Sequence, residues 1–294
     1  MRLNPFFAVT INIMKMFCAG GFSVDGTTAL IAGEGSLPIV IASRLTDTGR
    51  PPVVYSLREQ IGELSRYSLD IVRLPKPDLG FAIGDMKRRG VENIIMAGAV
   101  SKTLAFKPSL FDFTTQKFLA GLLFRDDHSL LGAIVDFLEK QGFRVLSYKE
   151  IIPDLLAREG YVAGRSPSGS ERSDAEYGFS ICKTLVPLSF GQTIVVNKRA
   201  VIAVEAMEGT DATLLRAGSL CHGGVVVKMM RMDQDERFDI PTVGPETLHN
   251  MAQAKLTCLA VHAGRTIIME GEKFRRIAQE ENISVIGVDP CQSS

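Results

Sequence analysis

Apolar runs alternate with amphipathic stretches along the first half of the chain, from residue 28 onward. Runs of strand length are predicted at 29–32, 53–57, 71–74, 93–97 and 143–148, and helices at 38–45, 78–89 and 128–140. In the last of these helices the apolar residues recur at helical spacing: Leu130, Leu131, Ile134, Val135 and Leu138. Because strands alternate with helices, this half predicts a Rossmann-like domain with a parallel sheet.

The second half has a different pattern, which predicts a mixed sheet. Residues 193–196 and 200–206 read as two strands paired about the turn at Asn197 and Lys198. Further strands are predicted at 225–230, 257–261, 265–269 and 284–288, and helices at 174–185, 210–220, 245–255 and 272–282. The fold class is therefore α/β, with two α/β domains.

A change of composition separates the two halves. Residues 164–170 contain Gly, Arg, Ser and Pro alone, a composition typical of loops. We therefore predict an N-terminal domain at 28–160, a linker at 161–173 and a C-terminal catalytic domain at 174–294.

Residues 1–27 do not share the regular pattern. The stretch from Phe6 to Gly21 is fairly apolar, but Asn12 and Lys15 interrupt it, and it is too short to span a bilayer. We interpret these residues as an extension outside the fold.

Charge and cysteine usage narrow the function classes. Lys and Arg total 33 and Asp and Glu total 33, so the chain has no net charge that would favour nucleic acid. The five cysteines are odd in number and form no C-x-x-C pair, which argues against disulfides and structural zinc. We expect a cytoplasmic protein that binds no nucleic acid.

Two glycine-containing turns follow strands of the first half. Gly33-Glu34-Gly35 precedes a helix, and Gly98 follows the strand at 93–97, so both turns could lie beyond the carboxyl ends of a parallel sheet, where ligands bind. Alone, the first turn is also compatible with a tight connection or with an NAD(P)-binding oxidoreductase.

Carboxylates follow two strands of the second half. Residues 200–204 lead into Glu205 and then Glu208-Gly209-Thr210-Asp211, and residues 225–228 lead into the acidic segment that contains Asp239. Carboxylates suit Mg²⁺, and Lys228 and Arg237 suit phosphate oxygens. Helix capping by Thr210 and Asp211 and a solvated acidic loop are the alternatives.

These segments together resemble one family. The N-terminal half carries residues 30–38 (LIAGEGSLP), 96–100 (MAGAV), 126–131 (DDHSLL) and Gly142-Phe143, and the C-terminal half carries 204–212 (VEAMEGTDA) and 237–245 (RFDIPTVGP). They are similar to the UDP-2,3-diacylglucosamine pyrophosphatase family of lipid A biosynthesis, of the LpxI type. The resemblance runs from about Ala29 to about Asp289.

The resemblance implies a magnesium-dependent hydrolase that splits UDP-2,3-diacylglucosamine into UMP and 2,3-diacylglucosamine 1-phosphate (lipid X). It also implies two domains with the ligand held in a cleft between them, and an essential aspartate in the Arg-x-Asp-x-Pro segment, which here is Asp239. A transient peripheral contact with the cytoplasmic face of the inner membrane, and a homodimer, are left open.

From both lines of reasoning we expect Asp239, Asp211 and Glu208 to serve catalysis and to bind Mg²⁺, with Mn²⁺ as the alternative metal. The residues expected to contact substrate are Gly33, Gly35, Gly98, Thr210, Lys228, Arg237 and Thr242. The rival functions are an NAD(P)-dependent oxidoreductase and a non-catalytic module that binds nucleotide or lipid.

Overall fold

The computed structural model describes residues 26–74, 78–100, 115, 127–188, 191–231 and 234–290, with side chains in the helix at 127–140 described from residue 131. The side chains of Asp126, Asp127 and His128, and most of the predicted extension, lie outside the described residues. Thr27, which we had placed in that extension, is the first residue of a strand.

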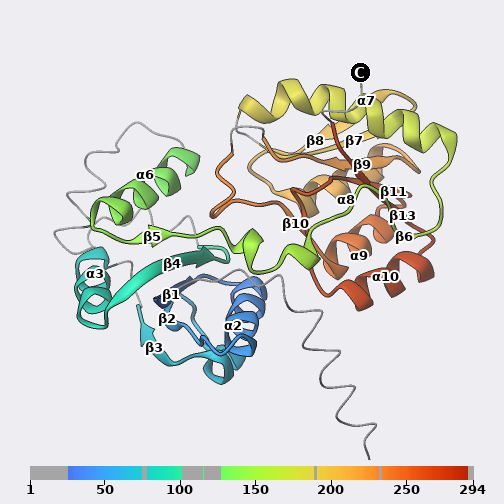
Figure 1. Cartoon of the computed structure of the whole chain (residues 1–294). Helices are drawn as coiled ribbons and strands as arrows, with labels where there is room; N and C mark the ends of the chain where they lie inside the picture. The colour runs from blue at the N-terminus through green and yellow to red at the C-terminus, as the bar shows by residue number, and fades with distance from the viewer. Residues whose placement is uncertain are drawn as a thin grey trace, which may run out of the picture.

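The N-terminal half is a five-stranded sheet in which every neighbouring pair is parallel (Figure 1). Its strands are β1 (Thr27–Ala32), β2 (Val53–Ser56), β3 (Asp70–Arg73), β4 (Val91–Ala97) and β5 (Arg144–Val145), in the order β3-β2-β1-β4-β5. Its helices are α2 (Leu37–Asp47), α3 (Leu79–Arg88) and α6 (Asp127–Lys140), with a 3₁₀ turn η1 (Gly62–Tyr67). The predicted Rossmann-like sheet is confirmed.

Alternating side chains of β1 bury the two faces of this sheet against different helices. Leu30 packs in the cluster that contains Ile41 of α2. Ala29 packs in the cluster that contains Met86 of α3 and Val135 of α6. Because successive strand residues point to opposite faces, this half has helices on both sides of the sheet.

The C-terminal half is built on a six-stranded mixed sheet, as predicted. Its strands are β6 (Gly160–Gly164), β7 (Thr193–Asn197), β8 (Ala200–Val204), β9 (Val225–Lys228), β11 (Cys258–His262) and β13 (Ser284–Val288), in the order β6-β13-β11-β9-β7-β8. Strands β9, β11 and β13 are mutually parallel, whereas β6 and β7 are antiparallel to their neighbours. A small parallel pair, β10 (Thr242–Val243) and β12 (Ile267–Ile268), lies outside this sheet.

Helices cover both faces of the mixed sheet. Helix α7 (Gly169–Leu185) lies on one face, and α8 (Thr210–Leu220), α9 (Pro245–Gln253) and α10 (Gly271–Glu280) lie on the other (Figure 1). Phe179 of α7 packs with Val227 of β9, while Phe274 of α10 packs with Val226 of the same strand. None of the helices in the described part of the chain combines the length and the apolar character needed to cross a bilayer.

The predicted linker at 161–173 is largely regular structure, so that prediction was wrong. Strand β6 pairs with β13, and α7 begins at Gly169 behind a capping box formed by Ser168 and Glu171. Loop-forming residues occur here because Gly164 has a φ of +72°, and a Cβ atom there would lie 1.8 Å from the carbonyl oxygen of Ile283. A glycine at position 164 therefore allows the two backbone segments to approach each other closely.

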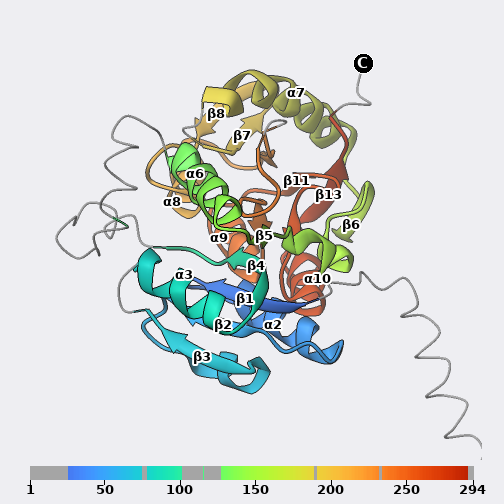
Figure 2. The same cartoon turned by 60° about the vertical axis from the view of Figure 1, so that its left-hand side comes forward.

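A shared apolar cluster joins the two halves. Leu30 and Tyr148 of the N-terminal half belong to the same buried cluster as Met230, Ile240 and Ile267 of the C-terminal half. The 3₁₀ turns η3 (Tyr148–Glu150) and η4 (Pro153–Leu155) lead from β5 into the C-terminal half, as Figure 2 shows.

Candidate functional site

The carboxyl ends of β8 and β9 lie at one edge of the mixed sheet. Strand β8 is antiparallel to β7, and β7 is antiparallel to β9, so β8 and β9 run in the same direction. Glu205 follows the end of β8, and Lys228 is the last residue of β9. The topology therefore places both groups at the edge where ligands bind in open α/β sheets.

Lys228 is the centre of the polar cluster at this edge. Its Nζ atom lies 3.3 Å from Oγ1 of Thr210 and 3.2 Å from the carbonyl oxygen of Thr242. Thr210 is the first residue of α8, and Thr242 begins β10. Three of the predicted substrate-binding residues, which are far apart in the sequence, are thus in contact.

Glu205 completes this cluster, and we had not assigned it a role. Thr210 Oγ1 donates to Glu205 Oε1 at 2.8 Å, and the N–H of Gln192 donates to Glu205 Oε2 at 3.2 Å. The carboxylate therefore orients the Thr210 hydroxyl, so that its lone pairs face Lys228. Its position directly after β8 is the sequence signal that could identify it.

Burial lowers the pKa of Lys228, and the nearby Glu205 and Asp211 carboxylates raise it. The balance leaves the pKa below its usual value. A partly desolvated ammonium group next to a threonine hydroxyl and a helix N-terminus is suited to phosphate oxygens.

The predicted acidic shell is not assembled in the structure. Glu208 forms an ion pair with Arg216, at 2.6 Å between Oε1 and Nη2, and it also accepts from Oγ1 of Thr213 at 3.2 Å. Asp211 lies in the first turn of α8, within the electrostatic reach of Lys228. Among the described residues no group of three or more His, Cys, Asp or Glu side chains could hold a metal ion. Asp239, Asp211 and Glu208 are therefore not a preformed three-carboxylate site.

Asp239 lies in the segment between β9 and β10, where it is partly exposed. Arg237 of the same segment donates to both carboxylate oxygens of Asp235 and forms an ion pair with Glu139 of α6, at 2.7 Å. The pair with Glu139 connects the segment to the N-terminal half, and the pair with Asp235 holds the Arg237 side chain within the segment. The predicted contact of Arg237 with a phosphate would have to replace them.

The glycine turns of the N-terminal half meet each other. Gly33 N–H donates to the carbonyl of Ala97 at 2.8 Å, and Glu34 and Ala99 exchange two backbone hydrogen bonds of 2.7 and 2.9 Å. A Cβ atom at Gly33 would lie 2.5 Å from the carbonyl oxygen of Ala99, and one at Gly98 would lie 2.7 Å from that of Glu34. Both glycines are explained by this close approach.

Ligand binding at these turns is limited by the same contacts. The N–H groups of Gly33 and Glu34 are used within the protein, and Arg58 donates to the carbonyls of Gly33 (3.3 Å) and Gly35 (2.5 Å). A pyrophosphate cradle would need such N–H groups, so this geometry does not favour the oxidoreductase alternative. Contact of Gly33, Gly35 and Gly98 with substrate stays a prediction.

His262, at the end of β11, is a further group that we had not singled out. It is buried, and its Nδ1 atom has no hydrogen-bond partner among the residues that the structure describes. Burial and the nearby Arg265 guanidinium lower its pKa, so the imidazole is neutral at pH 7. A lone histidine in an apolar strand gives no sequence signal that distinguishes such a position from an ordinary core residue.

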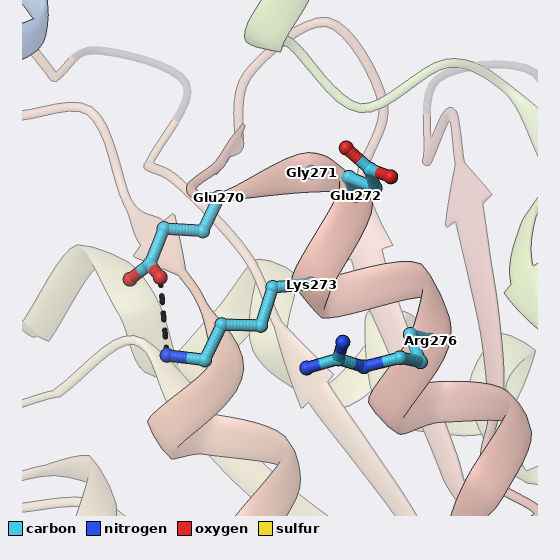
Figure 3. A pocket seen from close by; sticks show the side chains of 5 residues that line it. All are labelled: Glu270, Gly271, Glu272, Lys273 and Arg276. Atoms are coloured by element: carbon cyan, nitrogen blue, oxygen red, sulfur yellow. Dashed lines mark hydrogen bonds and ion pairs between the residues drawn. The ribbon is translucent and has the colours of Figure 1, made fainter.

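Two surface hollows lie elsewhere. One, of about 610 Å³, is lined by charged residues at the start of α10, with Lys273 paired to Glu270 (Figure 3). The other, of about 520 Å³, lies where η4, β6 and α10 meet, and its lining includes Leu156, Tyr161 and Phe274. Neither hollow is lined by a predicted site residue.

Comparisons with known proteins agree with this arrangement of two halves. The family model of the LpxI N-terminal domain matches residues 27–155, and that of the LpxI C-terminal domain matches residues 158–286. The chain is also 31% identical over 280 residues to the UDP-2,3-diacylglucosamine pyrophosphatase LpxI of Caulobacter vibrioides. That alignment covers 89% of this chain and 97% of the relative. This chain therefore belongs to the LpxI family.

Proposed function

We propose that this protein hydrolyses the pyrophosphate bond of UDP-2,3-diacylglucosamine, giving UMP and 2,3-diacylglucosamine 1-phosphate (lipid X) for lipid A biosynthesis. The observation that carries the proposal is the similarity over nearly the whole chain to a relative named for this activity. The cluster of Lys228, Thr210 and Glu205 supports it, because it gathers phosphate-binding chemistry at a ligand-binding edge.

The reaction adds one water to one phosphorus. The bridging oxygen leaves with the other phosphate, so that two phosphate monoesters result. Negative charge develops on the leaving oxygen, and the Lys228 ammonium group is placed to neutralise it, while the Thr210 hydroxyl orients a neighbouring oxygen. Asp239 orients the attacking water in this proposal.

Magnesium fits this site only with few protein ligands. Glu208 is paired with Arg216, and Asp211 lies next to the Lys228 cation, so we propose Asp239 as the protein carboxylate that binds Mg²⁺. One carboxylate, several waters and substrate phosphate oxygens are a usual ligand set for this ion. When bound, Mg²⁺ supplies charge neutralisation at the phosphate oxygens.

The substrate and product each carry two acyl chains, so we also propose a transient peripheral contact with the cytoplasmic face of a membrane. We propose that these chains lie in a cleft between the two halves. A homodimer stays a prediction.

The test is direct incubation of the purified protein with UDP-2,3-diacylglucosamine. We expect UMP and lipid X in equal amounts, separated by chromatography and identified by mass. Activity should vanish in excess EDTA and return when Mg²⁺ is added beyond the chelator. Absence of UMP would refute the proposed hydrolysis, whereas full activity in EDTA would refute only the metal requirement.

A further inference from the structure

The backbone on both sides of Asp239 is held by hydrogen bonds, although the residue lies outside any helix or strand. The N–H of Asp239 donates to the carbonyl of Asp235 at 3.3 Å. The carbonyl of Asp239 accepts from Nε2 of Gln234 at 2.6 Å, and the N–H of Ile240 donates to the hydroxyl of Tyr148 at 3.1 Å. Both peptide planes that flank the Asp239 Cα atom are therefore fixed, since φ and ψ are the two soft torsions of a residue.

The side chain of Gln234 connects two parts of the segment that contains Asp239. Its side chain is 6% exposed, and its Oε1 atom accepts from the N–H of Arg231 at 3.1 Å while Nε2 donates to Asp239. One amide thus joins the residues at the two ends of the segment. An apolar side chain of the same length could fill the space but could make neither bond.

Tyr148 reaches the segment from the N-terminal half. Its side chain is 2% exposed within the cluster shared by the two halves, next to Ile240. Ser147 and Lys149 on either side of it bind the carbonyl and the carboxylate of Glu236, so the whole segment is attached to η3. Burial raises the pKa of Tyr148 to about 12, and the nearby Asp239 contributes to this. The phenol is therefore neutral at physiological pH and brings no second negative charge to Asp239.

We propose that Tyr148 and Gln234 are positioning residues for Asp239. By fixing its backbone they orient its carboxylate for catalysis before substrate binds. The inference rests on the proposed function, because that proposal gives Asp239 its catalytic role. Its physical basis is that a small misplacement of a reacting group lowers the rate steeply. Neither residue touches the phosphates in this account.

The experiment compares Tyr148→Phe with a matched control, Tyr55→Phe. Tyr55 is also fully buried, and its hydroxyl donates to Asp85 at 2.9 Å, away from the C-terminal half. With UDP-2,3-diacylglucosamine as substrate, Tyr148→Phe should lower kcat by about tenfold to a hundredfold and leave KM within about twofold. The control should keep both constants within about twofold. Gln234→Met should lower kcat and leave KM unchanged in the same way as Tyr148→Phe. If Tyr148→Phe does not fold, the kcat of Gln234→Met is the test of the inference.

A double-mutant cycle separates positioning from a general structural effect. In an Asp239→Asn background, Tyr148→Phe should cause no further loss of the residual rate, because the group that it positions is already gone. Full additivity of the two losses, or a kcat of Tyr148→Phe equal to that of Tyr55→Phe, would overturn the inference while the rate of Asp239→Asn stays at its low residual value. Parent-like turnover by Asp239→Asn would instead overturn the proposed function together with the inference.

Discussion

Glu171 should stabilise the junction between β6 and α7 through its charge, and Glu171→Gln tests this. Its carboxylate forms an ion pair with Arg165, at 2.5 Å, and accepts from Thr257 at 2.7 Å and from the N–H of Ser168 at 2.8 Å. The substitution keeps the size of the side chain and removes its charge. The junction is the segment that the sequence predicted as a linker.

The expected loss of stability follows from the shift in the pKa of Glu171. Burial by itself raises this pKa, but the hydrogen bonds from Arg165, Ser168 and Thr257 outweigh burial and lower it from 4.5 to about 2. A difference of this size corresponds to about 3 kcal/mol in the free energy of unfolding. Because the pKa is lower in the folded state, this contribution is fully present above about pH 4.5 and is lost as the pH falls towards 2.

The assay is urea unfolding followed by far-UV circular dichroism, since the chain has no tryptophan. Glu171→Gln should be less stable than the parent by about 3 kcal/mol at pH 7, with the difference narrowing below pH 4.5. Glu63→Gln is the control, because Glu63 forms only an exposed ion pair with Arg66 and should change stability by about 0.5 kcal/mol or less. A loss for Glu171→Gln that is the same at pH 7 and pH 3 would show that the charge is not its source.

Two further predictions concern the site and the glycine turns. Lys228→Met should lower kcat by about a hundredfold or more, because it removes the cation that we propose neutralises the developing charge. Since burial depresses the pKa of Lys228, the parent should lose activity on the alkaline side below pH 10.5, whereas Lys228→Arg should not show that loss in a pH–rate profile. Gly33→Ala should destabilise the protein by about 1–3 kcal/mol in thermal unfolding, because its Cβ would meet the carbonyl of Ala99. Gly132→Ala in α6, where no atom of the described residues lies within 4 Å of the added Cβ, should be neutral or stabilising by up to about 1 kcal/mol. Parent-like stability of Gly33→Ala, or a parent-like rate of Lys228→Met, would contradict these assignments.

The sequence predicts the elements with strong periodicity well. Helix α8 spans Thr210–Leu220 as predicted. The predicted β7–β8 hairpin also forms, but its turn residues are Lys198 and Arg199, one position later than predicted, because Asn197 pairs with Ala200 as the last residue of β7. Prediction from the sequence fails where the residue type is required by contact with a residue that is distant in the sequence. Strand β6 ends in a glycine because Gly164 packs against the Ile283 backbone. The apolar run at 143–148 ends as a strand at Val145 because Leu146 and Tyr148 pack in the apolar cluster that the two halves share.

The site shows the same division. Lys228, Thr210 and Thr242 could be selected from their positions at strand and helix ends, and the structure brings them together. Glu205 also follows a strand end directly, so its position is the same kind of signal. Gln234 and Tyr148 could not be selected, because each acts through a hydrogen bond to the backbone next to Asp239, which no sequence pattern reveals. The carboxylates of Glu208 and Asp211 lie next to protein cations, Arg216 and Lys228, which a pattern of acidic residues does not reveal.

The measurement that tests the central claim most directly is product formation by Asp239→Asn. The substitution keeps the size of the side chain but removes the charge that we propose orients the water and binds the metal. We predict that the variant binds UDP-2,3-diacylglucosamine with an affinity close to that of the parent, and that UMP formation falls by several orders of magnitude, so that intact substrate is recovered from the complex. Turnover by Asp239→Asn at nearly the parent rate would contradict the account and would move the catalytic role to the turn between Glu208 and Asp211.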